Sequence, residues 1–182
     1  VGSAYESSIN IFQKTSNNIK LLRKINLEQQ VAHQGVPSFF FTDKQKRLWI
    51  ATTQGLLLKK SASESITTIH AVNDQPVAIA QDNYNHIWVA TKENGIYCID
   101  DRSLRSLPLH IGKETRGLKS DQIETMDVDN DGILWIGTKD NRLLSYQPAH
   151  NKVREIANTT LFEKNQLLDV VCLDRHIWLS TT

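Results

Sequence analysis

The sequence has few of the residues that define several large protein classes. Only two of its 182 residues are cysteine, which is too few for a disulfide framework, and it has eight glycines and four prolines. Hydrophobic residues make up 40% of the chain and charged residues 23%, a balance that excludes extended disorder, collagen-like sequence and coiled coil. No apolar run approaches the roughly 18 residues that cross a bilayer.

Charge of one sign is not in excess either. Lysine and arginine number 21, aspartate and glutamate 20, and no run of either sign exceeds two residues. We therefore expect neither a nucleic-acid-binding surface nor contact with a membrane. Residues 1–6 have neither the basic start nor the apolar stretch of a signal peptide. A mature or internal segment would look the same, so this absence does not fix the compartment.

The chain does contain a repeat. All four tryptophans lie in one five-residue pattern, aliphatic-Trp-aliphatic-small-Thr, at residues 48–52, 87–91, 134–138 and 177–181. The tryptophans are 39, 47 and 43 residues apart, which is close to the one-blade period of a β-propeller. A single blade cannot bury its own faces, so we expect Trp49, Trp88, Trp135 and Trp178 to fill the gaps between neighbouring sheets. Replacing Trp135 by alanine should then cost about 3–5 kcal/mol.

The residues around each tryptophan repeat as well. An aspartate stands six residues before it in three copies and four before it in the last, where we expect a shorter turn (Asp43, Asp82, Asp129 and Asp174). Turn-forming residues separate aspartate from tryptophan, and strand-like runs lie on both sides, so each unit is typical of a four-stranded antiparallel meander. The predicted fold is all-β, a β-propeller.

The repeat predicts three complete blades between two partial ones. The complete blades cover about residues 36–70, 76–109 and 122–156, and the partial blades cover 1–30 and 168–182. Either the chain is cut from a longer propeller, or its N-terminal strands complete the last blade and close a four-bladed ring. We favour the cut, because Val1-Gly2-Ser3 duplicates a strand that the last blade already has.

Residues 129–138, with the sequence Asp-Asn-Asp-Gly-Ile-Leu-Trp-Ile-Gly-Thr, closely resemble the two-component regulator propeller repeat. Residues 118–123 resemble the segment that leads into its first strand. Two features depart from the family pattern: Asn141-Arg142 stands where the family has Gly-Leu, and the last hairpin is short. The resemblance covers almost the whole chain.

This resemblance implies a periplasmic sensory segment. In that family the repeats form seven-bladed propellers in the periplasmic part of bacterial sensor proteins, most often hybrid histidine kinases that detect glycan fragments. The chain itself has no kinase, receiver or DNA-binding sequence, so those activities would belong to other parts of the parent. The partners implied are an oligosaccharide or other small ligand, the remaining blades and the downstream signalling domains.

Three residue patterns could indicate a metal or a disulfide, and each has a simpler explanation. Residues 127–132 match the first half of a calcium loop, but its twelfth position would be Thr138, and the repeat already explains Asp129 to Gly132 as a hairpin turn. The six histidines show no metal-ligand spacing. Cys98 and Cys172 fall in strands two blades apart, so free thiols are favoured over a bridge. No metal and no cofactor are predicted.

The sequence nominates no catalytic group. It has no glycine-rich phosphate loop, no G-x-S-x-G turn and no paired catalytic carboxylates at an interpretable spacing. Propeller lyases and hydrolases exist, so the fold alone does not exclude an enzyme. We expect this segment to be non-catalytic.

Topology predicts where a ligand would bind. In a four-stranded meander, the loop before each first strand and the turn between the second and third strands emerge on one face, here called the upper face. These loops are polar and rich in amides, which suits hydrogen bonding to sugar hydroxyls. The candidate ligand-binding residues are Tyr5, Glu6, His33, Gln34, Asn73, Gln75, Lys92, Glu93, Asn94, Lys119, Asp121, Asn141, Arg142 and Asn165. Tyr84 belongs to a turn on the opposite face.

The function predicted from the sequence is ligand recognition without chemistry, by a sensor propeller that binds an oligosaccharide in the periplasm. The first alternative is a protein-interaction or dimerisation scaffold, including a homodimer, with the upper face empty. The second is a propeller lyase.

Overall fold

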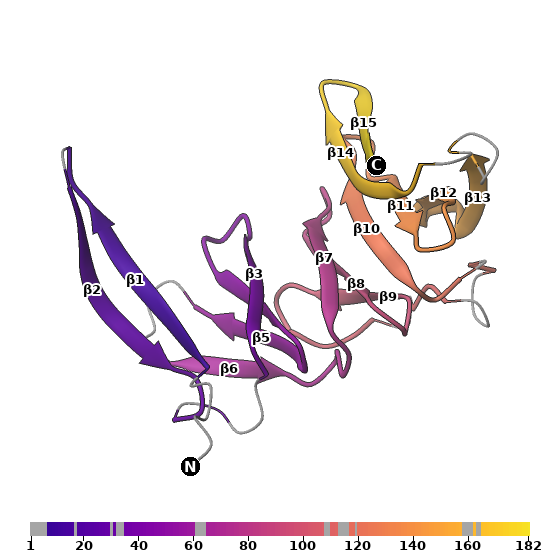
Figure 1. Cartoon of the computed structure of the whole chain (residues 1–182). Helices are drawn as coiled ribbons and strands as arrows, with labels where there is room; N and C mark the ends of the chain where they lie inside the picture. Colours follow the sequence, from indigo (N-terminus) through magenta and orange to yellow (C-terminus); the bar gives the residue numbers. More distant parts are fainter. Residues whose placement is uncertain are drawn as a thin grey trace, which may run out of the picture. The chain divides into compact units, whose positions relative to one another are not determined.

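The structure, a computed structural model, describes residues 7–16, 18–29, 31, 35–60, 65–107, 110–112, 117–118, 120–157, 162 and 165–182. The chain divides into two compact units, Val1–His70 and Ala71–Thr182. Figure 1 shows that the described residues are almost entirely strands, arranged as antiparallel sheets of neighbours in sequence. The all-β meander predicted from the repeat is therefore confirmed.

The first unit contains two sheets. One is a hairpin of two strands, β1 (Ser8–Lys14) and β2 (Ile19–Asn26). The other has four strands in sequential order, β3 (Pro37–Thr42), β4 (Leu48–Thr52), β5 (Gly55–Lys59) and β6 (Ile66–Ile69). Ile9 and Ile25 of the hairpin pack against Ile50 and Leu57 of the four-stranded sheet, so one apolar core joins the two sheets.

The second unit contains three sheets. The first has β7 (Pro76–Gln81), β8 (His86–Thr91) and β9 (Ile96–Asp100); the second has β10 (Ile123–Val128), β11 (Leu134–Thr138), β12 (Leu143–Gln147) and β13 (Lys152–Ala157). The third is the hairpin of β14 (Leu167–Leu173) and β15 (His176–Thr181). A short 3₁₀ turn, Pro148–His150, connects β12 to β13. The first strands β7, β10 and β14 are in contact in that order, as successive propeller blades require.

The repeated aspartate holds each long hairpin together. In the blade of β7 to β9, one carboxylate oxygen of Asp82 accepts the backbone N–H groups of Tyr84 and His86, and the other accepts the indole N–H of Trp88 at 2.9 Å. The same bond joins Asp43 to Trp49 and Asp129 to Trp135, at 2.8 Å in both. At a spacing of six residues, the aspartate that closes the turn can therefore also accept the indole N–H of the tryptophan.

The last hairpin is built differently. Asp174 and Arg175 both have positive φ, 49° and 62°, and Leu173 pairs directly with His176. Two such residues between paired strands form the tight connection that suits antiparallel strands. The short turn predicted from the four-residue spacing is confirmed, and the described side chains of Asp174 and Trp178 do not form the Asp–Trp bond of the other copies.

The four tryptophans differ in burial. Trp49 and Trp88 are fully buried, Trp135 is partly buried, and Trp178 is 62% exposed. Trp178 fills no gap between the described sheets, so its expected packing between sheets stays a prediction. The physical reason is that β15 pairs with β14 alone among the described strands, and Trp178 lies on the face of β15 opposite to the one packed against the preceding sheet.

A second difference concerns the fourth strand expected at residues 104–109. The described part of this segment makes only isolated bridges, Ile99 to Ser106 and Ile96 to Ile111. The side chain of Asp100 accepts the N–H of Ser103, and Leu104 has a φ of 59°, so these residues form the turn that follows β9. After the turn, Leu107 donates to the carbonyl of Cys98 at 2.8 Å, so the segment runs beside β9 without forming a regular ladder. Among the described residues, the blade of β7 to β9 therefore has three regular strands and a fourth segment that is joined to β9 only at separate points.

Candidate functional site

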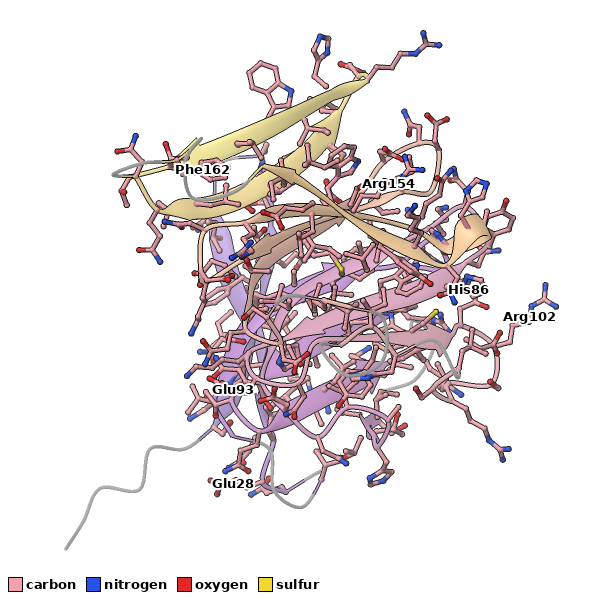
Figure 2. All side chains as sticks on the ribbon, turned by 90° about the vertical axis from the view of Figure 1, so that its right-hand side faces the viewer. Glu28, His86, Glu93, Arg102, Arg154 and Phe162 are labelled. Atoms are coloured by element: carbon pink, nitrogen blue, oxygen red, sulfur yellow. The ribbon has the colours of Figure 1, made fainter. Side chains whose placement is uncertain are left out.

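The loop before each first strand lies beside the end of the second strand. The N–H of the residue that follows the second strand donates to the carbonyl that precedes the first: Thr53 to Val36, Lys92 to Gln75, Lys139 to Gln122 and Thr182 to Gln166, at 3.0–3.1 Å. This repeated bond confirms the topology from which the upper face was predicted. Figure 2 shows Glu93, two residues after the end of β8, and His86, at the start of β8, on opposite sides of the unit.

In the second unit, the loops of the upper face form what we call the upper rim, residues 73–75, 92–95, 120–122, 139–142 and 165–166. Asp74 holds its first part. One carboxylate oxygen accepts the N–H groups of Glu93 and Asn94 at 2.8 and 3.1 Å, and the other accepts the N–H of Gln75 at 2.7 Å. Partial burial alone would raise the pKa of Asp74, but these hydrogen bonds outweigh it and hold the pKa below its usual value. Asp74 is therefore a carboxylate that shapes the turn.

Two bonds connect this turn to the next blade. The Gln122 amide donates to the carboxylate of Glu93 at 2.8 Å, and the N–H of Gly95 donates to the carbonyl of Asp121 at 3.0 Å. Beside them, a ring nitrogen of His110 lies 2.7 Å from the Asn94 carbonyl. The rim thus continues without a break from the sheet of β7–β9 to that of β10–β13.

An aromatic pair lies beside the same turn. The ring centroids of Tyr97 and His110 are 4.8 Å apart. Burial, together with the nearby charges of Asp74 and Asp121, raises the pKa of Tyr97, so its hydroxyl stays protonated and can donate a hydrogen bond.

The third part of the rim joins the last hairpin. The side chain of Asn141 donates to the carbonyl of Asn165 at 3.3 Å and accepts the N–H of Leu167 at 3.0 Å. Asn141 has a φ of 59°, the left-handed conformation that the glycine of the family pattern adopts readily. The departure noted in the sequence therefore leaves the turn intact and adds a contact to the next sheet.

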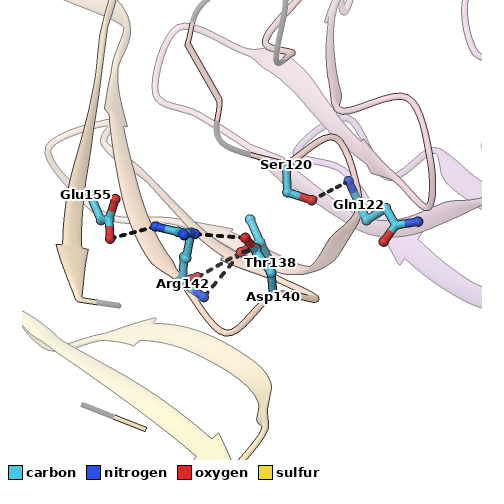
Figure 3. Close-up of polar contacts among 6 residues, drawn as sticks. All are labelled: Ser120, Gln122, Thr138, Asp140, Arg142 and Glu155. Atoms are coloured by element: carbon cyan, nitrogen blue, oxygen red, sulfur yellow. Dashed lines mark hydrogen bonds and ion pairs between the residues drawn. The ribbon is translucent and has the colours of Figure 1, made fainter. Parts of the chain in front are cut away.

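Arg142 lies at the outer side of this turn, as Figure 3 shows. Its guanidinium donates to Asp140 at 2.8 Å and to Glu155 at 3.0 Å, and the Thr138 hydroxyl donates to Asp140 at 2.5 Å. Partial burial would raise the pKa of Asp140, but the bonds from Thr138 and Arg142 prevail and lower it. Ser120 accepts the N–H of Gln122 in the neighbouring loop.

The structure places most of the predicted ligand-binding residues on this rim. It brings into one hydrogen-bonded surface Gln75, Glu93, Asn94, Asp121, Asn141 and Asn165. Asn73 and Lys92 are exposed beside it, whereas Arg142 is occupied by two carboxylates. Tyr5, Glu6, His33, Gln34 and Lys119 lie outside the described residues.

Sequence reasoning missed Asp74, Tyr97, His110 and Gln122 as members of this surface. Asp74 stands between two predicted residues, and Gln122 directly follows another, so the loop positions themselves were the available signal. Tyr97 carried no such signal, because it lies within a strand, and its place beside the rim is seen only in the folded chain, through its contact with His110.

The calcium interpretation of residues 127–132 gains no support. Both carboxylate oxygens of Asp129 are used by its own hairpin and by Trp135, and Asp127 accepts the N–H of Cys172 at 2.7 Å. Within the part of the chain that the structure describes, no three His, Cys, Asp or Glu side chains are grouped as a metal site would require.

Both cysteines are free thiols, as predicted, although only Cys98 is fully buried. Burial and the nearby aspartates raise the pKa of Cys98 and of Cys172 to about 12. Since the thiolate is the nucleophilic form, neither cysteine is activated for chemistry near neutral pH.

Comparisons with known proteins agree with this fold. A family model described as the two-component regulator propeller matches residues 117–140. The chain resembles the extracellular domain of a protein described as a hybrid two-component system from B. thetaiotaomicron, with a TM-score of 0.68 and 15% identity over 97% of the chain. It also resembles virginiamycin B lyase from Staphylococcus aureus, with a TM-score of 0.69 and 14% identity over 94% of the chain. No curated protein matches.

A third similar structure is YCF48 bound to D1 peptide, with a TM-score of 0.63 and 10% identity over 94% of the chain. The chain spans 26% of the B. thetaiotaomicron domain, 56% of the lyase and 54% of YCF48. Identities this low show a shared fold and nothing of ligand or activity.

The resemblance drawn from the tryptophan repeats is confirmed by the match at residues 117–140, which contains Asp129, Trp135 and the hairpin between them. The chain is a β-propeller segment that carries the two-component regulator propeller repeat.

Proposed function

We propose that the chain is a non-catalytic, extracytoplasmic sensory segment of a two-component signalling protein and that its upper rim recognises an oligosaccharide. The parent would resemble a hybrid sensor histidine kinase. The family match and the similarity to an extracellular domain support the location, and the described residues include no helix long and apolar enough to span a membrane.

One observation carries the proposal. The upper rim presents amide, hydroxyl and carboxylate groups from three sheets on one surface that is already fixed by hydrogen bonds, from Asp74 through Glu93 to Asn165. A surface that is ordered before binding loses little entropy when a ligand docks. Sugars need such groups, because each ring hydroxyl can both donate and accept.

A glycan array probed with the chain tests this function. The array should show saturable binding to an oligosaccharide. The double variant Asn73→Ala, Lys92→Ala should weaken binding by roughly tenfold, a typical loss when central contacts are truncated. These two side chains are exposed and take no part in the hydrogen bonds described above, so the rim should stay folded.

Tyr84→Ala is the matched control, because Tyr84 is 75% exposed in the hairpin between β7 and β8, on the opposite face. Its glycan binding should equal that of the unchanged chain. An array without any bound glycan, or binding that Tyr84→Ala removes and the rim variant does not, would overturn the proposal.

The scaffold alternative keeps one specific observation in its favour. Leu168, Val171, Leu173 and Trp178 of the last hairpin are each more than 40% exposed. Apolar side chains gathered in this way are typical of a face that is covered by a further sheet or by a partner.

A further inference from the structure

Two lysines of the upper rim occupy the same place in neighbouring sheets. Lys92 directly follows β8, and Lys139 directly follows β11. The backbone N–H of each donates to the carbonyl that precedes the first strand of its own sheet, Lys92 to Gln75 at 3.0 Å and Lys139 to Gln122 at 3.1 Å. Both side chains are exposed. The repeat therefore presents one ammonium group at the equivalent point of each sheet.

A single residue, Gln122, connects the two lysines. Its carbonyl accepts the N–H of Lys139, and its side-chain amide donates at 2.8 Å to the carboxylate of Glu93, the residue after Lys92. The hydroxyl of Ser120 accepts the backbone N–H of Gln122 at 3.2 Å, a bond that Figure 3 shows beside the turn that contains Lys139. Both ammonium groups therefore belong to one surface whose backbone is held by hydrogen bonds.

The acidic residues of the rim are occupied, whereas these two lysines are not. Each of the four acidic residues already has a partner within the protein: Asp74, Glu93, Asp121 and Asp140. Of the three basic residues, Arg142 is held by Asp140 and Glu155. Among the described residues, Lys92 and Lys139 form no hydrogen bond and no ion pair through their side chains. The charge that the rim can offer to a ligand without breaking an existing bond is therefore positive.

The aromatic pair of Tyr97 and His110 lies beside the turn that begins with Lys92. A ring nitrogen of His110 is 2.7 Å from the carbonyl of Asn94, two residues after Lys92. A Cβ added at Gly112 would lie 2.9 Å from the His110 ring, so the backbone also fixes this ring from the other side. Tyr97 and His110 are half-buried, which leaves part of each ring accessible. Next to Lys92 the rim thus offers an aromatic contact as well as a positive charge.

Resting on the oligosaccharide function proposed above, we propose that the ligand is an acidic oligosaccharide, whose sugars carry carboxylate or sulfate groups. Lys92 and Lys139 would each bind one acidic group, on either side of Gln122. The pair of Tyr97 and His110 would lie against a sugar ring. Hydrogen bonds between an ammonium group and an anion are roughly twice as strong as neutral ones, so such a ligand gains most from this surface. Because both lysines are exposed, binding should weaken as salt is added.

An array of matched glycan pairs tests this inference. Each pair holds an acidic oligosaccharide and the same oligosaccharide made neutral, either by reduction of its uronic acid carboxyls or by removal of its sulfates. The chain should bind an acidic member, and it should bind the neutral partner at least roughly tenfold more weakly, as expected for the loss of charge-assisted hydrogen bonds. The two kinds of pair show whether carboxylate or sulfate is recognised.

Two single variants test the lysines. Lys92→Gln and Lys139→Gln should each weaken binding of the acidic member by roughly tenfold, reduce its salt dependence and leave binding of the neutral partner unchanged. The rim should stay folded in both, because each position is bound through its backbone N–H. Lys152→Gln is the matched control, since Lys152 is exposed at the start of β13, at the end of the sheet away from the rim. It should bind as the unchanged chain does.

The outcomes separate this inference from the function on which it rests. Equal binding of the acidic and neutral members of every bound pair would overturn the acidic ligand and leave the oligosaccharide function standing. Equal weakening by Lys152→Gln and by the two rim variants would also overturn it, because the effect would then come from net charge alone. An array without any bound glycan would overturn the oligosaccharide function and this inference together.

Discussion

At the scale of single residues, the aspartate at each long hairpin closes the turn and also binds the indole of the tryptophan. Asp82 is 2% exposed, and its two oxygens accept two backbone N–H groups and the indole N–H of Trp88. An unpaired donor inside a protein costs about 1–3 kcal/mol. One side chain therefore couples the geometry of the turn to the position of the largest residue in the core.

Asp82→Ala should lower the free energy of unfolding by about 3 kcal/mol, because it leaves these donors without their acceptor. Asp174→Ala is the control, since Asp174 is exposed in the two-residue turn and its hairpin lacks the indole bond. Its loss should stay below about 1 kcal/mol. Urea denaturation of both variants checks this, and equal losses would contradict the role assigned to Asp82.

At the scale of strands and turns, the spacing of aspartate and tryptophan predicted the lengths of the hairpins. Local side-chain contacts determined where the structure departs from the regular strand pattern. The Asp–Trp spacing of six or four residues predicted both the long hairpins and the tight one, because the turn length follows from it. The strand expected at 104–109 could not be excluded from the pattern. The turn at Asp100, Ser103 and Leu104 leads into this segment, but its described residues meet β9 only at isolated bridges, and a break of this kind leaves no periodic signal in the sequence.

The turn between β8 and β9 depends on a glycine for two reasons. Gly95 has a φ of 68°, and a Cβ added there would lie 2.4 Å from the carbonyl oxygen of Ile111. Gly132 shares the first constraint, with a φ of 77°, but its Cβ would meet nothing within 4 Å. A comparison of Gly95 with Gly132 therefore separates the free-energy cost of the left-handed backbone from the cost of the close contact with Ile111.

Gly132→Ala should therefore cost about 1 kcal/mol, the usual penalty for a side chain in left-handed backbone. Gly95→Ala should cost more, because the backbone that pairs Ile96 with Ile111 would also have to shift. Thermal unfolding of the two variants measures the difference. If both variants lose the same stability, the close approach at Gly95 has no energetic role.

At the scale of the whole molecule, the repeat predicted the architecture. How deeply the tryptophan of each motif is buried depends on which sheets lie beside it. The four tryptophan motifs are nearly identical in sequence, yet Trp88 is fully buried and Trp178 is mostly exposed. Burial depends on the strands packed beside the motif, which lie tens of residues away in sequence. The same limit applied to the upper rim: loop positions could be predicted, but the contact between Tyr97 and His110 could not.

Because burial depends on the neighbouring sheets, the three tryptophans of the second unit should differ in how much each contributes to the free energy of unfolding. Trp88→Ala should cost about 3–5 kcal/mol, as expected for removing a large side chain from a closed core. Trp135→Ala should cost less than this range, which the sequence alone suggested for it, because its side chain is partly buried and already borders a cavity of about 470 Å³. Trp178→Ala should cost below about 1 kcal/mol. The three variants remove the same side chain from the same motif, so they share their local propensity effects. Urea denaturation in one buffer ranks them, and an equal loss at all three positions would mean that the motif itself, rather than packing between sheets, stabilises the fold.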